Sequence, residues 1–277
     1  MKGKKKGAGV LYMLLMGICV AVFLTSSGML IKKLVENKKQ DEAFDEISSL
    51  FEEHEDSGRP EEMIEATETL DESAARQWKR WWEETARDRY KVYQSLQQEN
   101  PDFVGWVKIE GTRIDYPVMY TPDRPEYYLH LDFQKRRSSY GTPFLDDRCR
   151  LEEPKTNLMV YGHHMKNGSM FADLQNYTKQ EYFTAHPYVQ FDLADQAGTY
   201  EIAAVVKVNA SSNQTPWQEL LFPKNEEEFD QAWKIFGRQR FYDTGVELTA
   251  EDELLALITC EYTQKDGRLL VIAKKVL

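Results

Sequence analysis

Two residues near the end of the chain have the types and spacing needed for thiol chemistry. Cys260 ends the apolar run LLALITC, and Arg268 begins the apolar run RLLVIAKKV after seven intervening residues. The two runs predict an antiparallel hairpin, in which the last residue of one strand faces the first residue of the next. We therefore expect the two side chains at one end of a sheet. A guanidinium there favours the thiolate form of a cysteine and can donate hydrogen bonds to a developing oxyanion.

A thiol nucleophile that cleaves an amide also needs a group that protonates the leaving amine. Histidine is the usual choice because its pKa of about 6.5 lies near physiological pH. Of the five histidines, only His163 and His164 directly follow an apolar strand, in the segment NLMVYGHHM. Successive residues of a strand point to opposite faces, so if extended geometry persists past Gly162 only one of these two rings is expected to face Cys260.

The cysteine content argues against a disulfide-stabilised scaffold. There are three cysteines, Cys19, Cys149 and Cys260, and Cys19 lies within the apolar N-terminal segment. A secreted disulfide framework uses a dense, even set of cysteines. A single Cys149–Cys260 bridge is still open, and it would remove the candidate nucleophile.

The N-terminus predicts a membrane anchor. Residues 1–7 form a basic tail, and residues 8–31 contain no charged residue. A helix of that length spans roughly 36 Å, enough to cross a hydrocarbon core of about 30 Å. A cleaved secretory signal is the alternative. Under both interpretations, residues 40–277 lie outside the cytoplasm. If the anchor is not cleaved, its lysine-rich tail lies on the cytoplasmic side.

The rest of the chain predicts an acidic helical linker, residues 32–84, followed by a mostly β domain, residues 85–277. After Pro101 come many short apolar or alternating runs separated by glycine turns, which is typical of a barrel or sandwich. Residues 225–241 predict an amphipathic helix within a long connection, residues 211–247. The net charge of −11 argues against a nucleic-acid partner, which requires a basic face.

Several segments resemble the sortase family. LITCEYTQKDGRLLVIAK resembles the sortase signature, a strand ending in Thr-Leu-x-Thr-Cys followed by an arginine on the next strand. NLMVYGHHMKNGSMFADLQNY resembles the histidine segment of class B sortases, and VGWVKIEGTRIDYPVMY, YYLHLDF and GTPFLDDRC follow the class B pattern in the same order. The resemblance covers roughly residues 85–277. Ala256 replaces the first threonine of the signature, at a position within the strand and away from the chemistry.

The resemblance implies a sortase-type β-barrel of about eight strands, with N-terminal helices and a helix in the long connection before the last hairpin. It also implies a cysteine transpeptidase in which Cys260 attacks the threonine carbonyl of a C-terminal sorting signal of Asn-Pro-x-Thr or Pro-x-Thr-Gly type, forming a thioacyl-enzyme. His163 would be the acid/base, and Arg268 would position the substrate and stabilise the oxyanion. The residues implied to line the groove are Leu129, Ser212, Trp217, Thr259 and Glu261.

The partners implied are secreted proteins bearing a sorting signal, together with an amine of a peptidoglycan precursor or a pilin; no metal or organic cofactor is implied. The protein would sit in the cell membrane of a Gram-positive bacterium, with its N-terminus cytoplasmic and its catalytic domain extracellular. His164 would point away from Cys260 or cap the loop, and would tolerate substitution. Two alternatives are a non-catalytic anchored surface protein that binds a partner and an exported cysteine hydrolase.

Overall fold

The computed structural model describes residues 4–55, 89–153, 156–194, 196–211, 216–263 and 265–276. The chain divides into two compact units, Met1–Asp45 and Glu46–Leu277. The first consists of most of helix α1 (Lys4–Glu55), which contains one segment, Tyr12–Ser49, long and apolar enough to cross a membrane. An N-terminal apolar helix is therefore present as predicted. Most of the predicted linker lies outside the described residues, and the domain boundaries at residues 7, 31 and 84 stay predictions.

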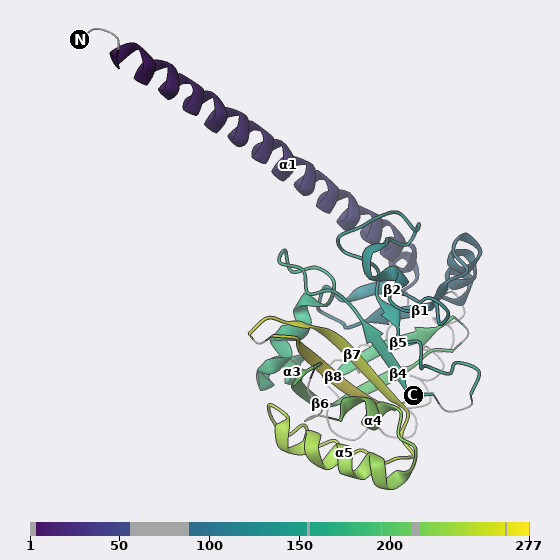
Figure 1. The fold of residues 1–277 in the computed structure, drawn as a ribbon. Helices are drawn as coiled ribbons and strands as arrows, with labels where there is room; N and C mark the ends of the chain where they lie inside the picture. The colour runs from purple at the N-terminus through teal and green to yellow at the C-terminus, as the bar shows by residue number, and fades with distance from the viewer. Residues whose placement is uncertain are drawn as a thin grey trace. The chain divides into compact units, whose positions relative to one another are not determined.

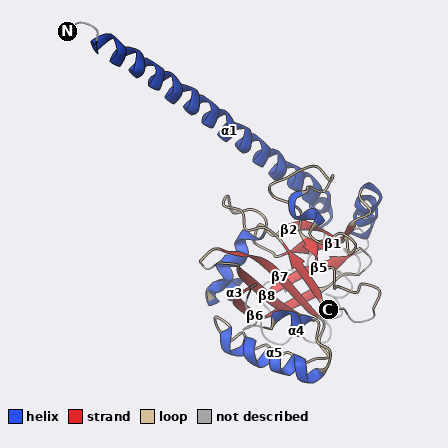
Figure 2. Ribbon diagram, in the orientation of Figure 1, coloured by secondary structure: helices blue, strands red, loops and turns tan. Residues whose placement is uncertain are grey.

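The second unit is a closed eight-stranded barrel (Figures 1 and 2), as predicted. Its strands follow the order β1-β2-β3-β4-β7-β8-β6-β5 around the barrel. Neighbouring strands are antiparallel except for the pairs β2–β3 and β4–β7, which are parallel. The strands are β1 (Phe103–Lys108), β2 (Asp115–Met119), β3 (Phe144–Leu145), β4 (Leu158–Tyr161), β5 (Tyr188–Leu193), β6 (Thr199–Asn209), β7 (Leu254–Glu261) and β8 (Gly267–Lys275).

Helices precede the first strand and occupy several connections between strands. The described ones are a helical segment at residues 89–99, the 3₁₀ helices η2 (Tyr127–His130) and η3 (Phe171–Thr178), and α3 (Gln180–Ala185), α4 (Trp217–Leu221) and α5 (Glu226–Gln239). The helix predicted in the long connection is α5. Asn225 caps it by accepting a hydrogen bond from the Glu228 backbone N–H at 2.9 Å, and three glutamates in the first turn favour this end of the helix dipole.

Strand β7 is buried along most of its length and reaches the surface at its C-terminal end. Its residues from Leu254 to Thr259 are all buried, and Cys260 is the first that is partly exposed. A strand that is covered on both faces reads as a continuous apolar run, as LLALIT does. The cysteine therefore stands where the buried strand reaches the surface.

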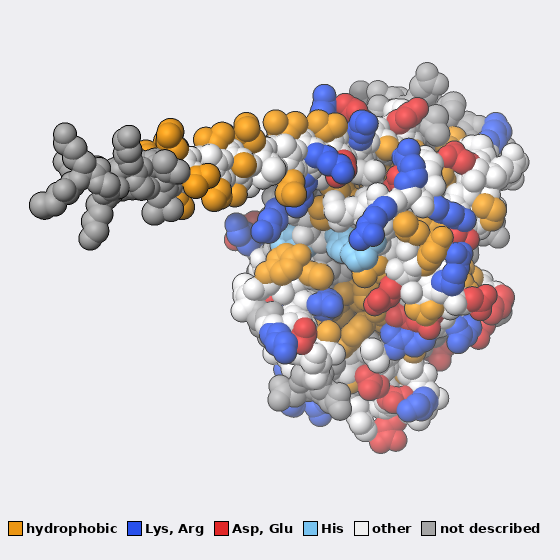
Figure 3. Space-filling model, turned by 45° about the horizontal axis from the view of Figure 1, so that its top comes forward, with side chains coloured by type: hydrophobic (Ala, Val, Ile, Leu, Met, Phe, Trp, Pro, Cys, Tyr) orange, Lys and Arg blue, Asp and Glu red, His pale blue; other side chains and the backbone are white. Residues whose placement is uncertain are grey.

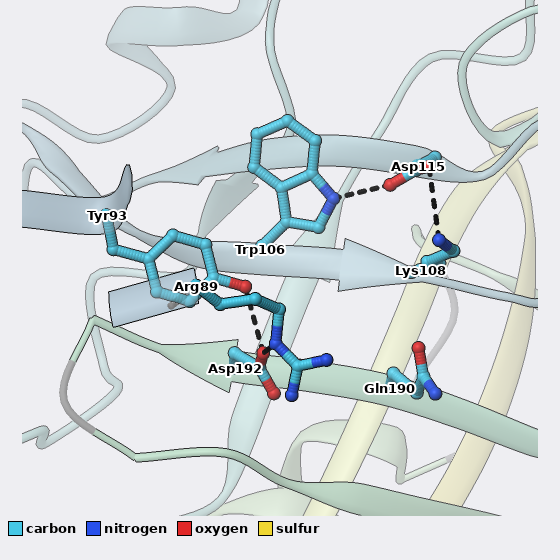
Figure 4. A pocket seen from close by; sticks show the side chains of 7 residues that line it. All are labelled: Arg89, Tyr93, Trp106, Lys108, Asp115, Gln190 and Asp192. Carbon is cyan, nitrogen blue, oxygen red and sulfur yellow. Dashed lines mark hydrogen bonds and ion pairs between the residues drawn. The ribbon is translucent and has the colours of Figure 1, made fainter. Parts of the chain in front are cut away.

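At another place on the barrel, the helical segment 89–99 is joined to β5 by a buried ion pair (Figure 4). Arg89 Nε lies 3.0 Å from Asp192 Oδ2, and both side chains are 6% exposed. The Tyr93 hydroxyl donates to the same oxygen at 2.9 Å, and the Gly198 backbone N–H donates to Oδ1 at 3.2 Å. Burial, followed by the charge of Asp192, raises the pKa of Tyr93 well above its usual value, so the phenol stays a proton donor.

Replacing Asp192 with alanine is expected to lower the free energy of unfolding by about 3–5 kcal/mol, because a buried guanidinium loses its carboxylate. Denaturant unfolding of the full-length protein in detergent micelles measures this. The control is Arg124→Ala, which removes a half-exposed partner of Asp102 and is expected to cost less than about 1 kcal/mol. Equal effects of the two substitutions would contradict the structural role of the buried pair.

Candidate active site

The predicted neighbourhood of Cys260 and Arg268 is confirmed. Cys260 on β7 is directly opposite Arg268 on β8 in the antiparallel register. Directly opposed residues project from the same face, with Cβ atoms roughly 4.5–5.5 Å apart. Cys260 is partly exposed and free, and so is available for chemistry. The guanidinium of Arg268 donates to the Gly267 carbonyl oxygen at 2.9 Å, which ties it to its own strand end.

Cys149 is not a disulfide partner of Cys260, because both thiols are free. Cys149 is fully buried, and that burial raises the pKa of its thiol to about 12. A thiol with such a pKa is almost entirely protonated at neutral pH and is a poor nucleophile. Of the two cysteines in the barrel unit, Cys260 is therefore the one suited to react.

The parallel pairing of β4 with β7 brings the histidine pair to the level of Cys260. Tyr161 pairs with Ile258, and the Gly162 backbone N–H donates to the Ile258 carbonyl oxygen at 3.0 Å. The chain then leaves the sheet at His163, beside the end of β7. In Figure 3, histidine side chains reach the surface on one face of the molecule, with hydrophobic side chains next to them and lysine and arginine side chains around them.

His163 is held from the side of η2. Its Nε2 lies 2.8 Å from the Leu129 carbonyl oxygen, and its ring stacks on His130 with centroids 5.9 Å apart. A carbonyl can only accept, so Nε2 carries a hydrogen in this geometry. Gly141, with φ of +62°, packs so closely that a Cβ there would lie 2.6 Å from the same carbonyl oxygen. Leu129, implied as a groove residue, thus contributes its main-chain carbonyl to the orientation of His163.

His164 does not point away from Cys260, which was one of the two orientations expected for it, because its ring contacts the Cys260 main chain. Its Nδ1 lies 3.1 Å from the Cys260 carbonyl oxygen, and its ring packs on Tyr262 at 5.2 Å between centroids. The alternation rule does not apply to His164, because β4 ends at Tyr161 and the strand geometry on which the rule depends stops there. His164 instead forms an isolated bridge with Met170.

Thr259 and Glu261 flank Cys260 and are both buried. The Thr259 hydroxyl donates to the Gly162 carbonyl oxygen at 2.8 Å. Glu261 lies 3.0 Å from Lys207 Nζ and accepts a hydrogen bond from the Thr263 backbone N–H. Burial alone raises the pKa of Glu261, but these hydrogen bonds outweigh it and lower the pKa below its usual value. In this structure, both side chains brace the end of β7.

The two remaining groove candidates lie in the long connection. Trp217 is 8% exposed and begins α4. Ser212 lies outside the described residues. Sequence reasoning missed Gln175, whose Nε2 donates to the Cys260 carbonyl oxygen at 3.4 Å. No local pattern marks Gln175, because its contact joins residues 85 positions apart.

Among the residues that the structure describes, no group of three or more histidine, cysteine, aspartate or glutamate side chains is placed to hold a metal ion. The chemical resources at the site are thus a thiol, a guanidinium and two imidazoles at one end of a barrel. This set suits acyl transfer through a covalent thioester.

Comparison with known proteins agrees with the fold. The family model for the sortase domain matches residues 107–276, and the chain belongs to the sortase family. Sortase B of Listeria monocytogenes is 34% identical over 184 residues, covering 65% of this chain and 72% of that protein. Sortase B of Staphylococcus aureus is 30% identical over 184 residues, covering 66% and 73%.

Solved structures of class B sortases are also similar to this chain. Clostridium perfringens sortase B superposes with a TM-score of 0.60 at 33% identity, covering 66% of this chain and 99% of that one. A complex of Staphylococcus aureus sortase B with substrate has a TM-score of 0.67 at 24% identity, covering 87% and 98%, and supports the fold alone. The chain is a class B sortase, a transpeptidase that joins a sorting-signal substrate to an amine nucleophile.

Proposed function

We propose that Cys260 is the nucleophile of this transpeptidase and forms a thioacyl-enzyme with the threonine of a C-terminal sorting signal. The observation that carries the proposal is the direct pairing of a partly exposed, free Cys260 with Arg268 at the end of a buried strand. The thiolate adds to the threonine carbonyl carbon and gives a tetrahedral oxyanion. Arg268, opposite Cys260, is the cation available to stabilise that charge.

Proton transfer in this scheme belongs to His163. Collapse of the oxyanion breaks the carbon–nitrogen bond, and the leaving amine takes a proton from the imidazolium. The Leu129 carbonyl holds Nε2–H, which leaves Nδ1 to exchange that proton. An incoming amine then loses a proton to the imidazole as it attacks the thioester, and Cys260 departs as thiolate. The products are a new amide and the starting enzyme.

The proposed substrates are secreted proteins that carry an Asn-Pro-x-Thr-type or Pro-x-Thr-Gly-type signal. The proposed acceptor is an amine of a peptidoglycan precursor or of a pilin. The apolar helix α1 supports attachment to the cell membrane, with the N-terminus cytoplasmic and the catalytic domain extracellular. Leu129, Ser212, Trp217, Thr259 and Glu261 stay the proposed groove residues, and the contacts above add a bracing role for Thr259 and Glu261.

A peptide panel tests the function. Peptides bearing each signal type are incubated with the full-length protein in detergent micelles, with and without glycine-type and lysine-type amines, and products are identified by mass. We expect cleavage after threonine and a transfer product heavier than the free acid by the mass of the amine less one water. Cleavage that gives only the free acid under every amine would identify a hydrolase, and the absence of any covalent intermediate would contradict the thioacyl step.

Replacing Arg268 with alanine is expected to lower kcat/KM for peptide cleavage by about 10²-fold, because the oxyanion loses a charged donor. Arg268→Lys is expected to recover only part of the loss, since an ammonium cannot reproduce the planar fork of donors. The matched control is Lys265→Ala, which removes an exposed cation from the same β7–β8 loop. Similar losses for Arg268→Ala and Lys265→Ala would point to the net charge of the loop and count against a specific oxyanion role.

A further inference from the structure

The main-chain carbonyl of Cys260 occupies an unusual position in the sheet. In an extended strand, every second carbonyl points toward the same neighbouring strand. The Ile258 carbonyl points toward β4, where it accepts from the Gly162 N–H. The Cys260 carbonyl therefore points to the same side, but β4 has already ended at Tyr161. The Cys260 carbonyl therefore lies beyond the end of β4, where no β4 backbone N–H is available to donate to it.

Two side chains supply hydrogen bonds to this carbonyl. His164 Nδ1 lies 3.1 Å from the oxygen, and Gln175 Nε2 lies 3.4 Å from it. His164 comes from the loop after β4, and Gln175 comes from η3. Gly162 allows η3 to come this close, because a Cβ at that position would lie 2.5 Å from the ring of Phe171. Both donors are partly buried, where an unpaired carbonyl carries a desolvation cost.

The His164 ring is itself fixed. It packs on Tyr262, whose hydroxyl donates to the His164 carbonyl oxygen at 3.2 Å. Because the Cys260 carbonyl can only accept, Nδ1 of His164 must carry a hydrogen. The ring therefore holds the end of β7 against the loop that also carries His163.

We propose that His164 and Gln175 are positioning residues, which hold the Cys260 main chain so that the thiol stays in register with His163 and Arg268. The proposal rests on Cys260 being the nucleophile. His164 acts here as a hydrogen-bond donor through Nδ1, and its titration is not required. The two adjacent histidines then have different roles. His163 transfers protons, and His164 holds the Cys260 main chain in position.

Asparagine separates these roles, because its amide nitrogen occupies nearly the position of Nδ1 and cannot titrate near neutral pH. With the full-length protein in micelles and a fluorogenic sorting-signal peptide, His164→Ala is expected to lower kcat about tenfold with little change in KM, as expected for one net hydrogen bond. His164→Asn is expected to stay within about threefold of wild type and to keep both limbs of the pH–rate profile. Gln175→Ala is expected to lose about threefold.

The double variant His164→Ala/Gln175→Ala should lose more than the product of the single losses, because only then is the carbonyl left without either donor. Lys166→Ala, an exposed position on the same loop, serves as the matched control. Thermal unfolding of each variant verifies folding. If an alanine variant unfolds, Gln175→Glu is used in its place. Glutamate keeps the shape of the glutamine side chain but removes its N–H donor.

Two outcomes would overturn the proposal. If His164→Asn is as inactive as His164→Ala and loses a limb of the pH–rate profile, His164 is an acid/base. If neither His164→Ala nor the double variant changes kcat, the carbonyl needs no support. Neither outcome is confused with failure of the proposed function, which shows separately as undiminished cleavage by Cys260→Ala.

Discussion

Replacing Cys260 with alanine is expected to abolish peptide cleavage and amine transfer together, with a fall in kcat of at least about 10⁴-fold. The reason is chemical, because the thiol forms the bond that stores the acyl group between cleavage and transfer. Mass analysis of enzyme mixed with peptide should show the thioacyl adduct in wild type and none in the variant. His163 and Arg268 cannot compensate, since neither is placed in the scheme as a nucleophile.

Cys149→Ala is the matched control for loss of a cysteine. Its thiol is buried and its pKa is raised to about 12, so cleavage should persist even if stability falls. Thiol labelling should likewise modify Cys260 faster than Cys149, since Cys260 is the partly exposed one of the two. Substantial cleavage by Cys260→Ala would reject the proposed nucleophile, and slow, unselective labelling would favour a scaffold that has lost its chemistry.

The part of the site that could be predicted from sequence is the part fixed by one hairpin. Cys260 and Arg268 are eight positions apart, and antiparallel pairing alone sets their register. The apolar runs on both sides determine where each strand ends. No knowledge of the remaining barrel was needed, which is why this contact was correct.

The contacts of the histidines could not be obtained in this way. His163 meets Leu129 across 34 positions, and His164 meets Cys260 across 96. Both contacts require the parallel β4–β7 pairing and the packing of η2 and η3, which no local pattern encodes. The strand alternation rule also required β4 to continue past Gly162, whereas β4 ends at Tyr161 and the His164 ring contacts the Cys260 carbonyl of β7.

The resemblance to class B sortases suggested site residues that the spacing of residues in the sequence could not. It did not indicate which atoms of those residues make contacts. Leu129 was implied as a groove residue, and the structure shows its carbonyl holding His163. Thr259 and Glu261 were implied in the same way, and both side chains bind parts of their own sheet. A residue next to a reactive group can thus be required for the geometry of the site as well as for substrate contact.

Replacing His163 with alanine is expected to reduce kcat/KM for peptide cleavage by about 10²–10⁴-fold, the usual effect of removing a general acid/base. The loss should exceed that of His164→Ala by at least about tenfold, because His164 contributes a hydrogen bond to the backbone and His163 carries the proton. The Leu129 carbonyl and the His130 ring contact the His163 ring from one side and help to orient it.

The substrate's leaving group provides the sharpest form of this test. An amine must be protonated to leave, whereas a thiolate leaves without a proton because the pKa of a thiol is about 8.5. A thioester analogue of the sorting signal should therefore recover most of the acylation rate that His163→Ala loses on the amide, measured as leaving-group release in the first turnover, but none of the acylation by Cys260→Ala. Equal losses on amide and thioester would show that His163 is not the acid in the acylation step. Rescue of His164→Ala in place of His163→Ala would transfer that role to the neighbouring ring.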